Sequence, residues 1–273
     1  MTGMPSADRA AVARALVTML RYSIELTQIG VQELGRGEVE NRDVQFLLTV
    51  HARGPVTPTD LSATSGSAPS VVSRALRRLE EVGLVARTRD PGDRRSVLVT
   101  LTGKGRRRIT GFSERLDDHF IASEPLLKDA FTALGLPLAE SAADAVVTPL
   151  VAVAELARVG AAYVEDVTHA LAPFSVHEFA DRFTLALIFL YGEQRPTQIA
   201  DELGFTLSGT SGVLTRLESA GLITRRHDVT AGDRRAVKLE LTPRGEDSVL
   251  VQLETFINHA PVLVSALRLT WRG

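Results

Sequence analysis

Short polar and basic side chains recur at helical spacing just after residue 69. At about 100° per residue, helical periodicity places four of them on one face of a predicted helix. These are Ser70, Ser73, Arg74 and Arg77. The apolar side chains of the segment lie on the opposite face and can pack against a core. Serine hydroxyls and arginine guanidinium groups donate hydrogen bonds to phosphates and base edges, so the polar face has the chemistry of a nucleic-acid contact.

An Asp-Arg-Arg triplet at residues 93–95 supplies a second basic group. Residues 84–90 and 96–101, on either side of it, have the composition of two strands joined by a turn. Arginines at the tip of such a hairpin can reach a phosphate backbone or the adjacent minor groove. The helix face and the hairpin tip would therefore contact the same kind of partner.

The segment that contains both groups occurs twice. Residues 70–90 align without gaps with 208–228, and residues 93–105 align with 233–245. Of these 34 positions, 17 are identical. A repeat of this length predicts two copies of one structural unit. The expected domains are residues 1–137, with a core at 43–105, and residues 138–273, with a core at 181–245.

Each copy is predicted to fold as three helices followed by a two-stranded hairpin. Proline suits the first turn of a helix, where its missing N–H would have no partner, and glycine ends helices. In the first copy the expected helices are 43–52, a short one from Pro58, and one opened by Ser67 and Pro69 that runs to Gly83. In the second copy they are Asp181 to Tyr191, Pro196 to Leu203, and Leu207 to Ala220 capped by Thr206. This order describes a winged helix-turn-helix. The predicted fold class is mainly α with small β-wings (α+β).

The two copies differ on the polar helix face. The second copy keeps serines at Ser208 and Ser211, but Gly212 and Thr215 replace both arginines. An arginine that makes a good base contact contributes about 1–3 kcal/mol of discrimination against the wrong base. Glycine inside a helix lowers helix stability by roughly 1 kcal/mol relative to alanine. Gly212 therefore indicates either close approach by another group or sequence drift. Two interpretations of the second copy stay open: it reads DNA differently, or it is mainly a dimerisation or ligand-sensing lobe.

Charge is distributed unevenly along the chain. The whole chain carries a net charge of −2, but residues 68–108 hold 11 basic and 4 acidic residues. Residues 206–248 hold 7 basic and 6 acidic residues, so the remainder is strongly acidic. A basic lobe on an acidic body is expected when one face meets phosphate. On charge alone, a solvated arginine-rich face explains the pattern equally well.

The absence of cysteine removes disulfides, thiolate metal sites, a catalytic thiol and cysteine-based redox sensing. The first ten residues have no apolar stretch typical of a signal peptide. The most apolar stretch, residues 145–164, is interrupted by Pro149, Glu155 and Arg158. We therefore expect no membrane span, and a cytoplasmic location.

Both repeats also carry a family resemblance. The runs SVVSRALRRLEEVGLVARTRDPGDRRSVLVTLTGKG (70–105) and SGTSGVLTRLESAGLITRRHDVTAGDRRAVKLELTPRG (208–245) resemble the MarR family of bacterial transcription regulators. The resemblance extends to long flanking helices at 10–34, 106–120, 149–171 and 245–259. Members of that family are normally homodimers joined by their terminal helices. Two copies in one chain therefore imply a covalent pseudo-dimer, although the apolar helix 149–171 could serve either an internal contact or a true dimer.

The resemblance also implies which residues meet double-stranded DNA. The third helix of each unit would lie in the major groove, and the wing arginines Arg95 and Arg235 would insert toward the minor groove. The implied DNA-binding residues are Ser70, Ser73, Arg74, Arg77, Arg87, Arg94, Arg95, Ser208, Ser211, Thr215, Arg225, Arg234 and Arg235. Asp93 and Asp233 would hold the two wings in place by pairing with basic neighbours.

A small aromatic effector is implied by the resemblance alone, held between the helical region and a winged unit. Tyr22, Tyr163 and Tyr191 are candidates to lie near it, although a lone tyrosine on a helix more often only packs. No cofactor is expected. The six histidines form no tight ligand motif, so metal sensing is disfavoured. No nucleophile–base set or carboxylate pair stands out, and the repeats leave no room for a catalytic domain, so we do not expect an enzyme.

The sequence therefore predicts a sequence-specific DNA-binding transcription regulator, a repressor that acts as a single-chain pseudo-dimer on an operator with unlike half-sites. The alternative is a non-catalytic winged-helix scaffold for protein partners. Exposed arginines on both the helix face and the wing of the first copy favour DNA, because a scaffold would more often present an apolar patch there.

Overall fold

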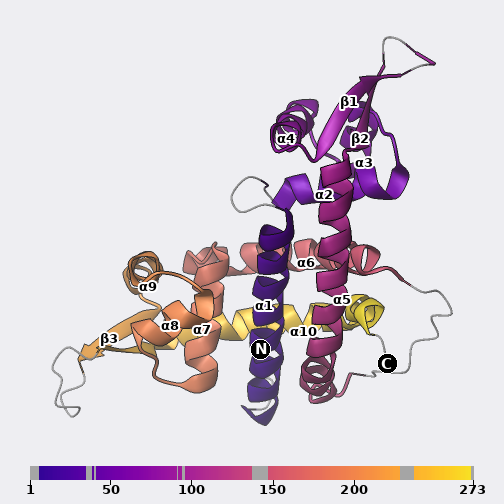
Figure 1. The fold of residues 1–273 in the computed structure, drawn as a ribbon. Coiled ribbons are helices and arrows are strands. Elements are labelled where there is room, and N and C mark those ends of the chain that lie inside the picture. Colours follow the sequence, from indigo (N-terminus) through magenta and orange to yellow (C-terminus); the bar gives the residue numbers. More distant parts are fainter. Residues whose placement is uncertain are drawn as a thin grey trace.

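The fold consists of two winged-helix units attached to a body of four long helices (Figure 1). The computed structural model describes residues 6–34, 39, 41–90, 92–93, 96–136, 147–227 and 237–271. The first copy comprises α1 (Ser6–Leu34), α2 (Asn41–Arg53), α3 (Pro58–Ser65), α4 (Pro69–Glu81), β1 (Val85–Arg89), β2 (Val97–Leu101) and α5 (Gly103–Thr132). The second copy comprises α6 (Pro149–Leu171), η1 (Ala172–Phe174), α7 (Phe179–Tyr191), α8 (Pro196–Leu203), α9 (Leu207–Ser219), β3 (Ile223–His227), β4 (Val237–Leu241), α10 (Pro243–Leu267) and η2 (Arg268–Thr270). The element order repeats, and the predicted fold class is confirmed.

The sheet of each unit is a short antiparallel hairpin that follows the third helix. Val85 pairs with Leu101 at the base of the first hairpin, and Ile223 pairs with Leu241 in the second. The loop after the first helix of each unit adds an isolated bridge to the second strand of the hairpin, from Val56 to Val99 or from Gln194 to Leu239. At the centre of the second hairpin Leu239 is fully buried, whereas the other residues of β4 are half-buried.

One glycine in each copy is explained by a close backbone approach. Gly105 and Gly245 lie in the first turn of α5 and α10, directly after the hairpins. A Cβ atom at either position would lie 2.0 Å from a backbone carbonyl oxygen, that of Leu84 or Leu222. Only glycine allows the long helix to leave the wing at this point, which accounts for its identity in both copies.

Several helix boundaries differ from the prediction. Helices α2 and α7 each begin two residues earlier than expected, at Asn41 and Phe179. The third helix of the first copy begins at Pro69 with Ala68 as its N-cap, and Ala68 has no side chain that can cap. The prediction that Ser67 opens this helix was therefore wrong by one residue. The terminal helices α5 and α10 continue beyond 120 and 259, past Pro125 and Pro261, because each goes on burying apolar side chains on its inner face.

The helical body joins the two copies. Figure 1 shows α1 and α5 running side by side, with α6 and α10 crossing them. Helix α1 packs along α5 and α6 packs along α10; between the copies, α1 packs on α10 and α5 on α6. If α1 and α5 are exchanged with their counterparts α6 and α10, each of these contacts takes the place of its equivalent in the other copy. Across this junction the rings of Phe131 and Phe256 lie 6.2 Å apart, so the two halves share one core.

The body departs from twofold symmetry at one contact. Helix α1 also packs against α7, the first helix of the second winged unit. Within the part of the chain that the structure describes, no contact of similar extent joins the equivalent pair, α6 and α2. The second winged unit is therefore attached to both terminal helix pairs, whereas the first is attached mainly to its own.

One helical segment is long and apolar enough to cross a membrane. Among the described residues this is Pro243–Thr270, which contains α10, and 44% of its most apolar window is buried within the protein. The described part of the stretch 145–164, the most apolar by inspection of the sequence, does not qualify. Because α10 packs along α6 as a core helix does, its composition alone is weak evidence of a membrane span.

Candidate nucleic-acid interface

Helix α4 presents the predicted polar face to solvent. Its buried side consists of Val72, Ala75, Leu76 and Leu79, which are at most 1% exposed. The predicted contact residues all lie on the exposed side, and they are Ser70, Ser73, Arg74 and Arg77. Helix α9 repeats this arrangement, and its exposed residues include Ser208, Ser211, Gly212 and Thr215. Both predicted helix faces are therefore accessible to a partner.

An ion pair to a buried aspartate fixes each of these helices to the first helix of its unit. In the first copy, Arg78 donates from Nε to Asp43 Oδ2 at 2.9 Å and from Nη2 to Oδ1 at 2.7 Å. Asp43 is completely buried. In the second copy Arg216 donates to Asp181 in the same way, with a shortest distance of 2.7 Å. Two parallel hydrogen bonds add directional strength to a charge pair, so these pairs set the orientation of the exposed face.

The sequence prediction missed this pair of residues. Both members are identical in the two copies at the shift that aligns the repeats, which is the signal that could have revealed them. The pair also restricts which arginines are free for a partner. Arg78 and Arg216 lie in the same helices as the predicted contact residues but are held by carboxylates of the fold.

Arg87 and Arg225 lie at the root of each wing, beside the helix. Arg87 Nε is 3.2 Å from Glu80, and Arg225 Nε is 3.0 Å from Glu218. Arg225 also donates to the hydroxyl of Thr215 at 3.4 Å. The structure thus brings these two predicted DNA-binding arginines to the edge of the helix face, where each is paired with a glutamate of that helix.

The first wing is closed by a turn near Asp93. The N–H of Ser96 donates to the carbonyl oxygen of Asp93 at 2.8 Å, and Asp90 accepts from the N–H of Gly92, also at 2.8 Å. Asp90 is therefore a turn residue that the sequence prediction did not single out. Arg94, Arg95, Asp233, Arg234 and Arg235 lie outside the described residues, so their predicted roles at the wing tips stay predictions.

The two interfaces differ in how their cations are paired. Within the described residues, Arg74, Arg77 and Arg89 of the first unit are exposed and have no ion-pair partner. Four cations of the second unit form ion pairs with acidic residues: Arg216, Arg225, Arg226 and Lys238. Since a paired cation is already partly neutralised, the first unit presents the stronger positive charge to a phosphate backbone.

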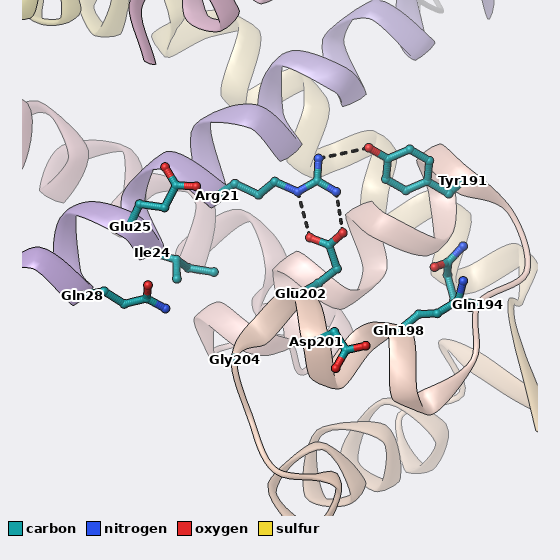
Figure 2. A pocket seen from close by; sticks show the side chains of 10 residues that line it. All are labelled: Arg21, Ile24, Glu25, Gln28, Tyr191, Gln194, Gln198, Asp201, Glu202 and Gly204. Atoms are coloured by element: carbon teal, nitrogen blue, oxygen red, sulfur yellow. Dashed lines mark hydrogen bonds and ion pairs between the residues drawn. The ribbon is translucent and has the colours of Figure 1, made fainter. Parts of the chain in front are cut away.

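A pocket of about 690 Å³ lies between α1 and the second winged unit (Figure 2). Arg21 of α1 reaches across it and forms a bidentate ion pair with Glu202 of α8, at 2.7 and 2.8 Å. Its third nitrogen donates to the hydroxyl of Tyr191 at 3.2 Å. The hydrogen bonds to Glu202 raise the pKa of Arg21 above its already high value. The ion pair across the pocket therefore links the first copy's terminal helix to the second copy's helix-turn-helix.

The three tyrosines occupy different environments. Tyr191 lines the pocket, whereas Tyr22 and Tyr163 are buried in the helical body. Tyr22 stacks on His119 with ring centroids 5.1 Å apart, and Tyr163 meets His259 edge-on at 5.7 Å. Burial raises the pKa of Tyr163 to about 12. The tyrosines at 22 and 163 are thus packing residues, and only Tyr191 remains a candidate for contact with a ligand in that pocket.

Neither histidine of these pairs belongs to a metal site in the described chain. His119 lies 3.6 Å from Glu25, and His259 lies 2.8 Å from Asp166. Among the described residues, no group of three or more histidine, aspartate or glutamate side chains could hold a metal ion. Burial lowers the pKa of His119, and Glu25 partly opposes this shift.

Geometry and element order define two winged helix-turn-helix units. The MarR family model matches the chain twice, over residues 40–97 and 181–237, which fall within these two units. The chain therefore carries two MarR-family winged-helix domains in tandem.

Two Bacillus subtilis proteins named as HTH-type transcriptional regulators are similar in sequence. YfiV is 40% identical over 58 residues, which cover 21% of this chain and 35% of YfiV. YdcH is 29% identical over 110 residues, which cover 36% of this chain and 75% of YdcH. The chain thus spans about a third of the length of YfiV and three quarters of that of YdcH.

Several solved structures are similar to part of the chain. The transcriptional regulator Tm0710 from Thermotoga maritima is 29% identical, with a TM-score of 0.31 over 41% of this chain and 73% of that one. A mutant of MepR from S. aureus, bound to an oligodeoxyribonucleotide, is 26% identical, with a TM-score of 0.32 over 39% and 76% of the two chains. Each of these likenesses covers less than half of the present chain.

Proposed function

We propose that the chain is a sequence-specific DNA-binding transcription regulator in which two winged-helix units work as a single-chain pseudo-dimer. The observation that carries this proposal is the exposed face of α4. It presents Arg74 and Arg77 without ion-pair partners in the described chain, while the neighbouring Arg78 is held by Asp43. The two MarR-family domains and the names of the two B. subtilis relatives support the same function.

Helix α4 would lie in the major groove of a duplex. Arginine can donate two hydrogen bonds to the O6 and N7 atoms of guanine, and serine can bond to either base type. Arg74 and Arg77 would read base edges or hold phosphates, and Ser70 and Ser73 would adjust the fit. The wing would follow the backbone beside this groove, with Arg95 toward the minor groove. Arg87, paired with Glu80, would support the root of the wing and add to the positive electrostatic potential beside the helix.

The helical body would act as the dimer interface of the family, made within one chain. The contacts of α1 with α10 and of α5 with α6 support this proposal, because they interconvert when the copies are exchanged. The boundary between the domains would fall between residues 137 and 138, outside the described residues. Two recognition helices separated by about one helical turn, roughly 34–36 Å, would then bind successive major grooves. Because α4 and α9 differ in their exposed residues, the operator would have unlike half-sites.

Such a protein would act in the cytoplasm, as a repressor that covers a promoter. The pocket between α1 and α8 is the best candidate for an effector site. Its lining combines Ile24 and Tyr191 with Arg21 and the carboxylates of Glu25, Asp201 and Glu202, so an uncharged aromatic ligand could stack there and accept a hydrogen bond from the guanidinium. A ligand bound here would compete with Glu202 for Arg21 and shift the second winged unit.

Selection from a random duplex library tests the proposed function. The full chain should enrich one family of sequences, and binding should weaken as salt rises, since contacts to phosphates release counterions. An R74A/R77A variant should lose affinity about tenfold or more, at roughly 1–3 kcal/mol per base contact. R158A is a matched control, because Arg158 is an exposed arginine of the helical body paired with Glu155. Failure to enrich any sequence, or equal binding by all three proteins, would contradict the proposal.

A further inference from the structure

The second recognition helix begins with two exposed apolar side chains. Phe205 is 47% exposed and Leu207 is 58% exposed, and they flank the capping residue Thr206. The first copy has Ser67 and Pro69 at the equivalent positions. Side chains at the start of a recognition helix are the ones that reach base edges. The two recognition helices therefore differ at their tips as well as on their faces.

The exposed face behind this tip contains two glycines, Gly209 and Gly212. A Cβ at Gly209 would make ordinary contacts, 3.5 Å from Thr206 Oγ1 and 3.8–3.9 Å from Phe205 Cβ and Cδ2. A Cβ at Gly212 would meet only the flexible end of Arg216, at 3.9 Å. No packing within the described chain thus requires glycine at 212, although glycine in a helix costs roughly 1 kcal/mol. A surface that approaches from outside the chain would account for it.

From Phe205 to Thr215 this face carries no charged side chain, and the exposed Glu218 beyond it is paired with Arg225. Between residues 205 and 217 the only charged residue is Arg216, and its guanidinium is paired with Asp181. A stretch without an unpaired carboxylate does not repel a phosphate backbone. It also lacks the arginine or lysine that reads guanine in the major groove, so it is suited to DNA of a different composition from that read by α4.

We propose that α9 reads an A·T-rich half-site through the C5 methyl groups of thymine, with Leu207 and Phe205 as the contacting side chains. This inference rests on the proposed function and names the sequence class that the second unit recognises. The thymine methyl group is the apolar feature of the major groove, and apolar side chains recognise it by contact. Gly212 lets the helix backbone approach the base edges closely. The hydroxyls of Ser208, Ser211 and Thr215 accept or donate to either base.

The surface fits this duplex better than it fits a protein partner. Its two apolar side chains lie at one tip, and the residues behind them are small and polar rather than a continuous apolar patch. It occupies the same position in its unit as the arginine-bearing face of α4. The operator is therefore a guanine-containing half-site for the first unit next to an A·T-rich half-site for the second.

Replacement of thymine by deoxyuridine tests this inference, because it removes only the methyl group. The operator is first obtained by library selection with the full chain. The half-site whose base preference disappears in R74A/R77A belongs to the first unit, and the other half-site belongs to the second. Deoxyuridine throughout the second half-site should weaken binding by about fourfold for each contacted methyl, the effect of one buried methyl group. The same replacement in the first half-site should have a smaller effect.

A Leu207→Ser variant completes the test. It should bind the thymine operator more weakly than the parent chain and should lose most of the sensitivity to deoxyuridine. Circular dichroism melting checks that it folds, as expected for a substitution at an exposed position. Full binding to a deoxyuridine second half-site would overturn the inference. So would unchanged affinity after the second half-site is scrambled, which would indicate a protein partner for this face. If the parent chain binds no duplex at all, the proposed function fails instead.

Discussion

Arg21 of α1 and Glu202 of α8 join the two copies of the repeat by a bidentate ion pair across 181 residues of sequence. The residue of the first copy that is equivalent to Glu202 is Thr64, which cannot form such a pair. Only the second winged unit is therefore fastened to the opposite copy's terminal helix by this contact. The asymmetry of the chain is built into its body as well as its interfaces.

Removing this ion pair should loosen one winged unit and leave the other unchanged. The variant E202A is expected to lower the unfolding free energy by no more than about 1 kcal/mol, because the pair is partly exposed and solvent screens it. Amide hydrogen exchange in α8 and α9 should become faster, while exchange in α3 and α4 stays the same. E155A, which breaks the exposed pair with Arg158, should change neither. Equal acceleration of exchange in both winged units would show that the ion pair does not hold the second unit specifically.

The ion pair between the buried Asp43 and Arg78 should matter more for stability. R78M leaves the carboxylate of Asp43 buried without its cation, and the expected loss is about 3 kcal/mol. R216M should cost less, because Arg216 is 52% exposed while Arg78 is 33% exposed. R77M changes an exposed arginine one position away and should stay within about 0.5 kcal/mol. Denaturant titration of the three variants measures these losses, and an R77M loss as large as that of R78M would refute the assignment.

Gly212 should show opposite effects on stability and on binding. G212A replaces a helical glycine in open space, so it is expected to stabilise the fold by up to about 1 kcal/mol and to weaken DNA binding. G160A is the matched control, since Gly160 lies within α6 with nothing near its Cβ position. It should stabilise to a similar degree without affecting DNA. If G212A binds DNA as well as the parent chain, no close approach occurs at this position.

His119 should make stability depend on pH. Burial lowers its pKa in the folded state, against partial opposition from Glu25, so the folded protein favours the neutral ring. The unfolded chain then takes up the proton first as pH falls below about 6.5. The contribution of His119 to the unfolding free energy is therefore complete above that pH and is lost as pH falls toward its folded-state pKa. Unfolding free energies of the parent chain and H119Q should converge or cross as the solution is acidified from pH 8 to 5. An H119Q curve that runs parallel to the parent curve would contradict the assignment.

Local signals predicted the winged units well. The expected helix Pro196 to Leu203 matches α8, because proline occupies its first turn and Gly204 ends it in the left-handed conformation. The exposed face of α4 followed from helical periodicity. The start of α4 was wrong by one residue because the helix begins with proline and has no side-chain cap.

Long-range pairs were harder to predict. Asp43 and Arg78 lie 35 residues apart, and only their recurrence in the second copy could have suggested the pair. Arg21 and Glu202 left no such signal, since the first copy has Thr64 in place of Glu202. The burial of Tyr22 and Tyr163 also depends on how the terminal helices rotate against each other, which the sequence of one helix does not determine.

The most direct test of the account is DNA binding across a salt series, with the stoichiometry of the complex measured by light scattering. The duplex is the operator obtained by selection with the full chain. The account predicts that one chain saturates one operator with two unlike half-sites, and that affinity falls steeply as salt rises. Two chains on each operator would contradict the single-chain pseudo-dimer. Absence of binding above the level of unrelated DNA would contradict the proposed function itself.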